Sequence, residues 1–195
     1  MEDKKSEETR KKISSKIIET LKGSDEIMGE ITNLVKNTVV NALKGTEAIG
    51  TEVARVTKDA VKGAIEGVRE IGGDLGKAAK GSVKGTMEGI AEIRGDFSKV
   101  VTDAVKTAVN RASEVGGDVA KIAKSAVEGA IEAARDIGYD AGKITKDAVI
   151  GVVEAAEEIS SKAGKAVKEN LEGSIEGAKE IIKKAFGKKE DEKKD

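Results

Sequence analysis

The chain has 195 residues and a net charge of −1, and 36% of its residues are charged while only 2% are aromatic. Because the sequence contains no His and no Cys, thiol catalysis, disulfides and the usual zinc sites are excluded, and the balanced charge provides no basic field for nucleic acid. With so few aromatic side chains, we expect a shallow interior of Val, Ile, Leu and Ala.

The chain begins with a charged segment, residues 1–14, which we predict to be a flexible tail, and a second charged tail is predicted at 187–195. The first segment lacks the apolar region of a secretory signal. No apolar run reaches the roughly 18 residues that a membrane-spanning helix needs. We therefore expect a cytoplasmic protein that meets membranes only at their surface, as a peripheral protein.

Between the tails, residues 15–186 follow a 22-residue repeat. Twenty-two residues complete six helical turns at about 3.67 residues per turn, so each repeat position keeps its place on a helix. The apolar positions then form one broad stripe, which we predict to face lipid or a partner. Eight units follow one another without insertion, beginning at Ser15, Asn37, Asp59, Gly81, Asp103, Ser125, Asp147 and Glu169. The predicted stripe comprises Val61, Ile65, Ile71, Leu75, Val83, Met87, Ile90, Ile93, Phe97, Val105, Val109, Val115, Val119, Ile122, Val127, Ile131, Ile137, Ile144, Val149, Val153 and Ile159.

Several units also contain a junction, such as EIGGD at 70–74 and EVGGD at 114–118. Gly followed by Asp resembles a helix C-cap and the N-cap of a next helix, which favours a stack or bundle of short helices. The apolar phase nevertheless continues across every junction, and no Pro marks a turn. We therefore prefer an all-α fold with one continuous or gently kinked amphipathic helix, about 260 Å long. Its predicted kinks are Gly72, Gly73, Gly116 and Gly117.

The chain contains 23 Gly, and each one in a helix interior costs about 1 kcal/mol relative to Ala. Exposed charge pairs return only about 0.2–0.5 kcal/mol each, so the helix must bury its stripe against something. We therefore expect a conditionally folded chain that is partly or wholly disordered when dilute.

Small residues recur four apart at the edge of the stripe. They permit two interpretations: they keep the face shallow, or they allow a second helix to approach closely. Self-association through the stripe would give a right-handed coiled-coil oligomer, because the sub-period is 11 residues. The glycines of this small-residue stripe are Gly63, Gly67, Gly85, Gly89, Gly129, Gly151, Gly173 and Gly177.

The segments TKDAVKGAIEG (57–67) and AKSAVEGAIEAA (123–134) resemble the 11-residue repeats of the group 3 late embryogenesis abundant proteins. KGAIEGV (62–68) is also similar to the repeat region of α-synuclein, whereas the related 22-residue unit of exchangeable apolipoproteins usually contains Pro. The resemblance implies a chain that becomes helical on membranes or on drying and that protects membranes and proteins under stress.

Together these observations favour a non-catalytic amphipathic-helix protein that binds lipid surfaces reversibly. The alternative is a structural helical bundle or a filament-forming protein. Carboxylates recur as a surface pattern without a catalytic partner, so we expect no enzymatic activity, no metal, no cofactor, no small-molecule substrate and no nucleic acid.

Overall fold

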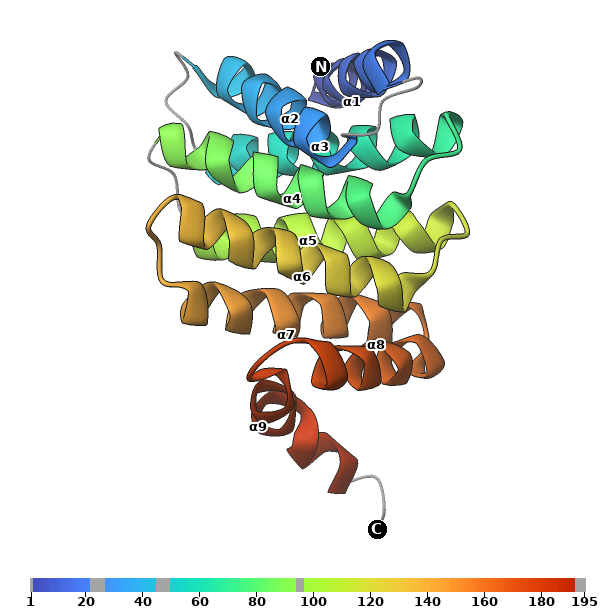
Figure 1. Cartoon of the computed structure of the whole chain (residues 1–195), viewed down its shortest axis with the longest axis vertical. Helices are drawn as coiled ribbons and strands as arrows, with labels where there is room; N and C mark the ends of the chain where they lie inside the picture. Colours follow the sequence, from blue (N-terminus) through green and yellow to red (C-terminus); the bar gives the residue numbers. More distant parts are fainter. Residues whose placement is uncertain (1, 22–26, 45–49, 94–96, 192–195) are drawn as a thin grey trace.

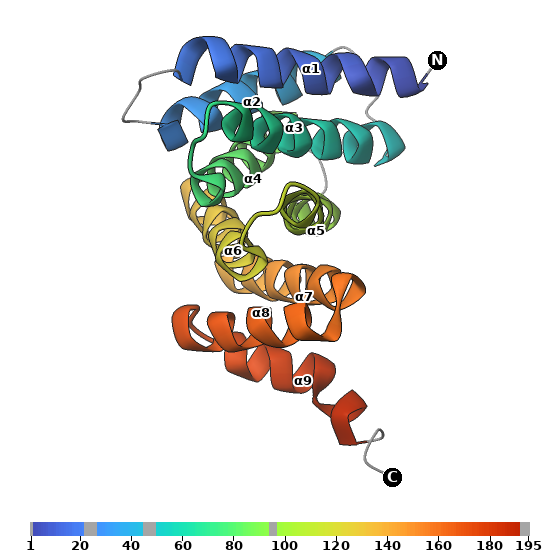
Figure 2. The same cartoon turned by 90° about the vertical axis from the view of Figure 1, so that its right-hand side faces the viewer.

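The computed structural model describes residues 2–21, 27–44, 50–93 and 97–191, which form nine α-helices. The odd helices α1, α3, α5 and α7 stack in one layer, and the even helices α2, α4, α6 and α8 stack in a second layer beside it (Figure 1 and Figure 2). Each helix therefore packs on the helix two places earlier as well as on its neighbour in sequence. The helices are α1 (Glu2–Leu21), α2 (Ile27–Leu43), α3 (Gly50–Glu70), α4 (Leu75–Glu92), α5 (Phe97–Glu114), α6 (Val119–Asp136), α7 (Ala141–Ile159), α8 (Ser161–Ser174) and α9 (Ala178–Asp191).

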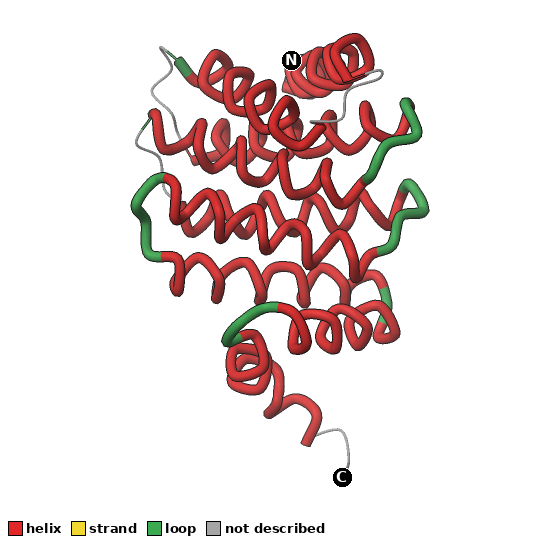
Figure 3. The backbone as a smooth tube through the Cα atoms, viewed as in Figure 1, coloured by secondary structure: helices red, strands yellow, loops and turns green. Residues whose placement is uncertain are grey.

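The preference for one continuous helix was wrong, and the cause lies in the Gly–Asp junctions. Gly72 and Gly116 both adopt left-handed backbone conformations, with φ of 69° and 75°. The next residue, Gly73 or Gly117, donates its N–H to a carbonyl five residues back, at 2.9 and 2.7 Å. This is the Schellman pattern that ends a helix. The four predicted kinks are thus residues of two complete turns, drawn as loops in Figure 3.

The same junctions start the next helices. Asp74, Asp118 and Asp140 lie in extended conformations, and their carboxylates accept hydrogen bonds from backbone N–H groups of the first turn. An N-cap of this kind satisfies a donor that has no partner within the helix. Gly138 takes the left-handed position in the third junction, with φ of 70°, while Tyr139 occupies the following place. In these three junctions a left-handed glycine holds the first position and Gly or Tyr the second, whereas Ser160 holds the first position between α7 and α8 in an extended conformation.

The turns at 71–74, 115–118 and 137–140 preserve the repeat because they all use the same number of residues, whereas Ser160 alone separates α7 from α8. Consecutive helices consequently present their apolar faces toward the space between the two layers, where a continuous core of Val, Ile, Ala and Leu runs along the stack. Fully burying one Val or Ile side chain contributes about 1.5–3 kcal/mol. The interior is shallow because it is only two helices deep, as expected for a chain so poor in aromatic residues.

The prediction of a flexible N-terminal tail at 1–14 was wrong for the described residues of that segment. Residues 2–14 belong to α1, because Ile13 and Ile17 are fully buried and anchor this helix to the stack. At the other end α9 extends to Asp191, so the helix covers most of the predicted tail 187–195. Residues 192–195 lie outside the described residues.

Candidate functional site

The structure places most of the predicted apolar stripe inside the chain's own core. Most of its members at the third and seventh repeat positions, such as Val83 and Met87, are fully buried between neighbouring helices. The members next to the turns, such as Ile71 and Leu75, are half-buried and pack against the same core. Ile159 is the one large apolar side chain among the described residues that is exposed, at 38%. The stripe thus has partners within the chain. The fully or almost fully buried members are Val61, Ile65, Val83, Met87, Ile90, Val105, Val109, Ile122, Val127, Ile144, Val149 and Val153. The half-buried members are Ile71, Leu75, Ile93, Phe97, Val115, Val119, Ile131 and Ile137.

The predicted small-residue stripe lies at contacts between helices of the same layer. A Cβ at Gly63 or Gly67 would collide with α1, at 2.6 Å from the carbonyl oxygen of Arg10 and 2.8 Å from Cβ of Ile17. At Gly85, a Cβ would collide with the carbonyl oxygen of Thr32 in α2. The absence of side chains here lets one helix rest on the backbone of another. Gly89, Gly129 and Gly151 make equivalent contacts with α2, α4 and α5.

The two remaining glycines of this stripe, Gly173 and Gly177, differ from the others. Gly173 has open space around it, and Gly177 adopts a left-handed conformation, with φ of 77°, between α8 and α9. The matching segment of α4, Thr86 to Gly89, is helical. A cleft of about 660 Å³ lies beside this break and is lined mainly by α6, α7, the α8–α9 turn and the start of α9.

Ion pairs cross each layer beside the glycine contacts. Lys36 of α2 lies 2.7 Å from Glu92 of α4, and Lys84 of α4 lies 2.6 Å from Asp136 of α6. Their hydrogen bonds to these carboxylates raise the pKa of Lys36 and of Lys84 above the usual value for lysine. The acidic flank of one helix therefore faces lysines of the helix two places earlier. The same relation joins Lys80 to Glu132 at 2.6 Å and Lys106 to Glu154 at 2.7 Å.

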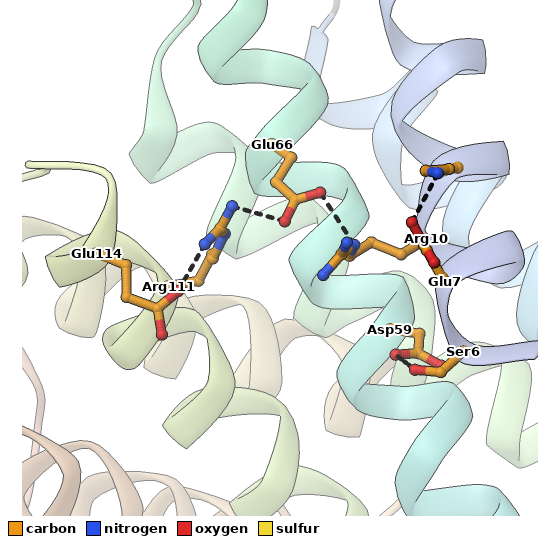
Figure 4. Close-up of polar contacts among 8 residues, drawn as sticks. Ser6, Glu7, Arg10, Asp59, Glu66, Arg111 and Glu114 are labelled. Carbon is orange, nitrogen blue, oxygen red and sulfur yellow. Dashed lines mark hydrogen bonds and ion pairs between the residues drawn. The ribbon is translucent and has the colours of Figure 1, made fainter. Parts of the chain in front are cut away.

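The odd layer contains a denser polar cluster, shown in Figure 4. The carboxylate of Glu66 in α3 lies between two guanidinium groups, 3.4 Å from Nε of Arg10 in α1 and 2.6 Å from Nη2 of Arg111 in α5. Nearby, the hydroxyl of Ser6 donates to Asp59 at 2.5 Å. Burial raises the pKa of the Asp59 carboxyl, although Ser6 and Arg55 oppose the shift. This cluster connects α1, α3 and α5.

A groove runs between α1 and α2 at the N-terminal end of the stack, which we call the N-terminal groove. It consists of two adjoining cavities of about 360 and 320 Å³ that share Lys16 and Leu34. Glu8, Lys12, Lys16 and Glu19 lie on the α1 side, and Glu30, Asn37 and Asn41 lie on the α2 side. The repeat pattern did not predict this groove, although the sequence contains a signal for it. Lys12 and Lys16 occupy repeat positions at which most other units have an apolar or small residue.

Within the described ranges, no helix combines the length and apolar character needed to cross a bilayer. No group of three or more acidic side chains there is arranged to hold a metal ion.

The fold is that of an α-helical repeat protein. The chain is similar to the crystal structure of a de novo designed helical repeat protein, DHR7, with a TM-score of 0.52 and 17% sequence identity, over 94% of this chain and 96% of that chain. At this identity the similarity concerns the fold alone. No protein-family model and no curated protein sequence matches the chain.

Proposed function

We propose that this protein is a self-contained structural scaffold, a helical repeat protein whose stack is folded without lipid and which acts by holding surfaces in fixed positions. The observation that carries the proposal is the burial of the apolar stripe, since side chains such as Val83 and Val127 are fully enclosed by the chain's own helices. The proposal corresponds to the structural alternative of the sequence interpretation, and it assigns the protein no catalytic role.

The glycines support the same proposal. Because the glycines lower helix propensity, the helices can form only if their apolar stripe is buried. The helix two places earlier in the chain buries it. Gly63 and Gly85 lie where a side chain would collide with backbone atoms of α1 and α2. Close packing of this kind compensates for the lost helix propensity because it brings large apolar surfaces together. The chain therefore needs no outside surface to become helical.

Binding of a lipid surface would require the stack to open. The stripe faces the space between the layers, and the outer surface carries Lys, Glu and Asp in alternating pairs. The resemblance to late embryogenesis abundant proteins implies protection of membranes instead. The vesicle experiment below distinguishes that function from the scaffold.

The N-terminal end favours a finite stack over a filament. In the interior, Gly63 and Gly85 accept the backbone of a preceding helix. The equivalent residues two helices earlier are Glu19 and Asn41, whose side chains would keep another helix away. Terminal repeats with polar outer faces are typical of helical repeat proteins that end in solvent. We therefore propose a monomeric scaffold.

Sedimentation equilibrium combined with vesicle flotation tests this function. The scaffold proposal predicts a monomer that does not float with vesicles of anionic phosphatidylserine and phosphatidylcholine. A matched variant, Gly85→Leu, forces α2 and α4 apart and should float more strongly than the wild type if the stripe can reach lipid at all. Flotation of the wild-type chain at low salt, with a gain of helix content, would contradict the proposal.

A further inference from the structure

The turn between α8 and α9 falls at a place where the repeat is otherwise helical. Gly177 is the ninth residue of the last unit, and the ninth residue of the five preceding units lies inside α3, α4, α5, α6 or α7. Comparison with α4 is the most direct, because the segments GTMEGIAE (85–92) and GSIEGAKE (173–180) share Gly, Glu, Gly and Glu at matching places. The first segment is helical throughout, whereas the second is broken, with φ of 77° at Gly177. One sequence pattern thus adopts two backbone conformations in this chain.

The α8–α9 turn is also built differently from the turns before α4, α6, α7 and α8. Each of those helices follows a residue whose side chain accepts a hydrogen bond from the first turn, namely Asp74, Asp118, Asp140 and Ser160. By contrast, α9 follows Gly177, which has no side chain that could serve as an N-cap. The sequence therefore fixes the other four breaks more firmly than it fixes this one.

The buried side chains of α8 and α9 keep one helical phase across the break. They follow one another at intervals of three or four residues, which is the spacing of one face of a helix. The phase also continues across the Gly–Asp junctions, but there the caps determine that the chain turns. Without a cap at Gly177, residues 161–191 can also form one continuous helix. The buried apolar residues of this segment that share the face are Val167, Leu171, Ile175, Ala178, Ile182 and Phe186.

In the broken form, α9 packs on α7 and α8 at the C-terminal end of the stack (Figure 2). Ile182 and Phe186 are each only 5% exposed, and the ammonium group of Lys168 in α8 lies 5.2 Å from the centre of the Phe186 ring. On another side of α9, two cavities of about 660 and 430 Å³ share Glu180 and Ile181. The helix is therefore held by one apolar face and is bordered elsewhere by open space.

A continuous helix would separate α9 from this position. The residue of α4 that matches Glu180 is Glu92, where α4 ends, so residues 181–191 would extend beyond the stack. Ile182 and Phe186 would lose their contacts, and α7 would lose the helix that covers it. A second copy in the same state has the complementary helix and the complementary vacant surface. Exchange of the two helices restores each contact, because each surface receives the same residues from the other chain.

On the strength of these features, we propose that the surface of α7 and α8 that holds α9 also binds the α9 of a second copy, with Gly177 as the hinge. The proposal rests on the proposed scaffold function, since α7 and α8 must be held by a folded stack. The occupant is α9 because its residues Ala178, Ile182 and Phe186 are the ones enclosed at this surface. The monomer predominates in dilute solution because association costs translational freedom, and the exchanged dimer forms when chains refold at high concentration.

Sedimentation velocity after refolding from urea at high protein concentration tests the proposal with two matched variants. Gly173→Ala and Gly177→Ala each add a methyl group that has no atom within 4 Å. At Gly177, Ala is strained by the left-handed conformation and favours a helix, so Gly177→Ala should raise the dimerisation constant at least about tenfold. Gly173 is already helical in α8, so Gly173→Ala should dimerise like the wild type.

Cross-linking distinguishes the exchange of α9 from any other contact between two chains. The chain has no Cys, and Ile150 of α7 and Ile181 of α9 line the same cavity. Two Gly177→Ala chains, one with Ile150→Cys and one with Ile181→Cys, should be joined by a short bismaleimide after they refold together. They should not be joined when they are folded separately in dilute solution and then mixed. With the wild-type hinge, a chain that carries both cysteines should be cross-linked within the monomer, which checks the reach of the reagent.

Three results would each overturn the proposal: a Gly177→Ala variant that stays monomeric, equal dimerisation of the two alanine variants, or a dimer that the reagent does not cross-link between chains. If the wild-type chain is helical in circular dichroism while any of these results is obtained, the exchange proposal alone fails. A wild-type chain without helix would instead reject the scaffold function.

Discussion

Arg111 of α5 donates to Glu66 of α3 across 2.6 Å, at a repeat position where several other units carry Gly or Ala. The α3–α5 contact thus exchanges close backbone packing for an ion pair. Arg10 of α1 shares the same carboxylate at 3.4 Å, so one glutamate connects three successive helices of the odd layer. We therefore expect the polar cluster to contribute to the stability of the stack.

Glu66→Gln is expected to destabilise the fold by about 1 kcal/mol. The Glu66 side chain is 18% exposed, so its charge-assisted hydrogen bonds are screened less than those of a surface pair. Glu114→Gln is the control, because Glu114 also contacts Arg111 but its side chain is 56% exposed. Urea denaturation checks the difference, and equal stabilities for the two variants would show that the shared carboxylate has no special weight.

Gly116→Ala is expected to cost about 1–2 kcal/mol, because an L side chain is strained at its φ of 75°. No atom lies within 4 Å of the added Cβ, so the effect would report backbone conformation alone. Gly29→Ala places a Cβ in equally open space within α2 and should stabilise the fold by up to about 1 kcal/mol. If both variants were stabilised, the chain would be helical through residue 116, as a continuous rod requires.

Gly85→Ala is expected to cost about 1–3 kcal/mol for a different reason. Its Cβ would overlap the carbonyl oxygen of Thr32, and the two helices would have to separate. Gly173→Ala adds the same methyl group where nothing lies within 4 Å, and it should be neutral or stabilising. Thermal unfolding of both variants distinguishes close packing from a shallow outer face, since the shallow-face interpretation predicts two similar changes.

The pH dependence of stability should show opposite signs at two carboxyls. The hydrogen bond from Lys121 lowers the pKa of Asp74 below its ordinary value of 3.8, so this carboxylate stabilises the fold above that pH and its contribution is lost on acidification. Asp74→Asn keeps a capping side chain but removes the charge. The variant should be less stable than the wild type near pH 7, and the two should converge in acid.

Burial raises the pKa of Glu88 above its ordinary value of 4.5. The contribution of Glu88 is therefore complete below 4.5 and is lost as the pH rises through the folded-state pKa. Glu88→Gln should be more stable than the wild type near pH 7, with an advantage that shrinks in acid. Denaturant titrations at both pH values check the two variants, and a shared direction of change would contradict this electrostatic description.

The repeat predicted the helices and their apolar stripe, but it did not predict which surface covers that stripe. The columns that contain Val61 and Ile65 identified the core side chains, because their spacing places them on one helix face in any arrangement. Nothing in the spacing specifies whether that face meets lipid, a second chain or the next repeat. The capping signal at Gly72 and Asp74 was present in the sequence, but the uninterrupted apolar phase outweighed it in our interpretation. The phase continues across the turns at 71–74, 115–118 and 137–140 because these turns use the same number of residues.

The N-terminal groove was harder to predict because its signal is an exception to the repeat. Lys12 lies in the segment 1–14 that composition assigns to a charged tail, and Lys16 is the second residue of the first unit. The residues that stand 44 positions later in α3, Val56 and Ala60, are buried. The exception is therefore visible only when α1 and α3 are compared. The ion pairs between helices of one layer were foreseeable as flanking charges, but their partners, such as Lys84 and Asp136, depended on the stacking of every second helix.

Far-ultraviolet circular dichroism in dilute buffer, followed through thermal unfolding, tests the central claim most directly. The account predicts a fully helical spectrum without lipid, a cooperative melting transition and no change when anionic vesicles are added. A spectrum of a disordered chain that becomes helical only with vesicles or on drying would contradict it, and would favour a conditional helix whose stripe seeks an outside surface.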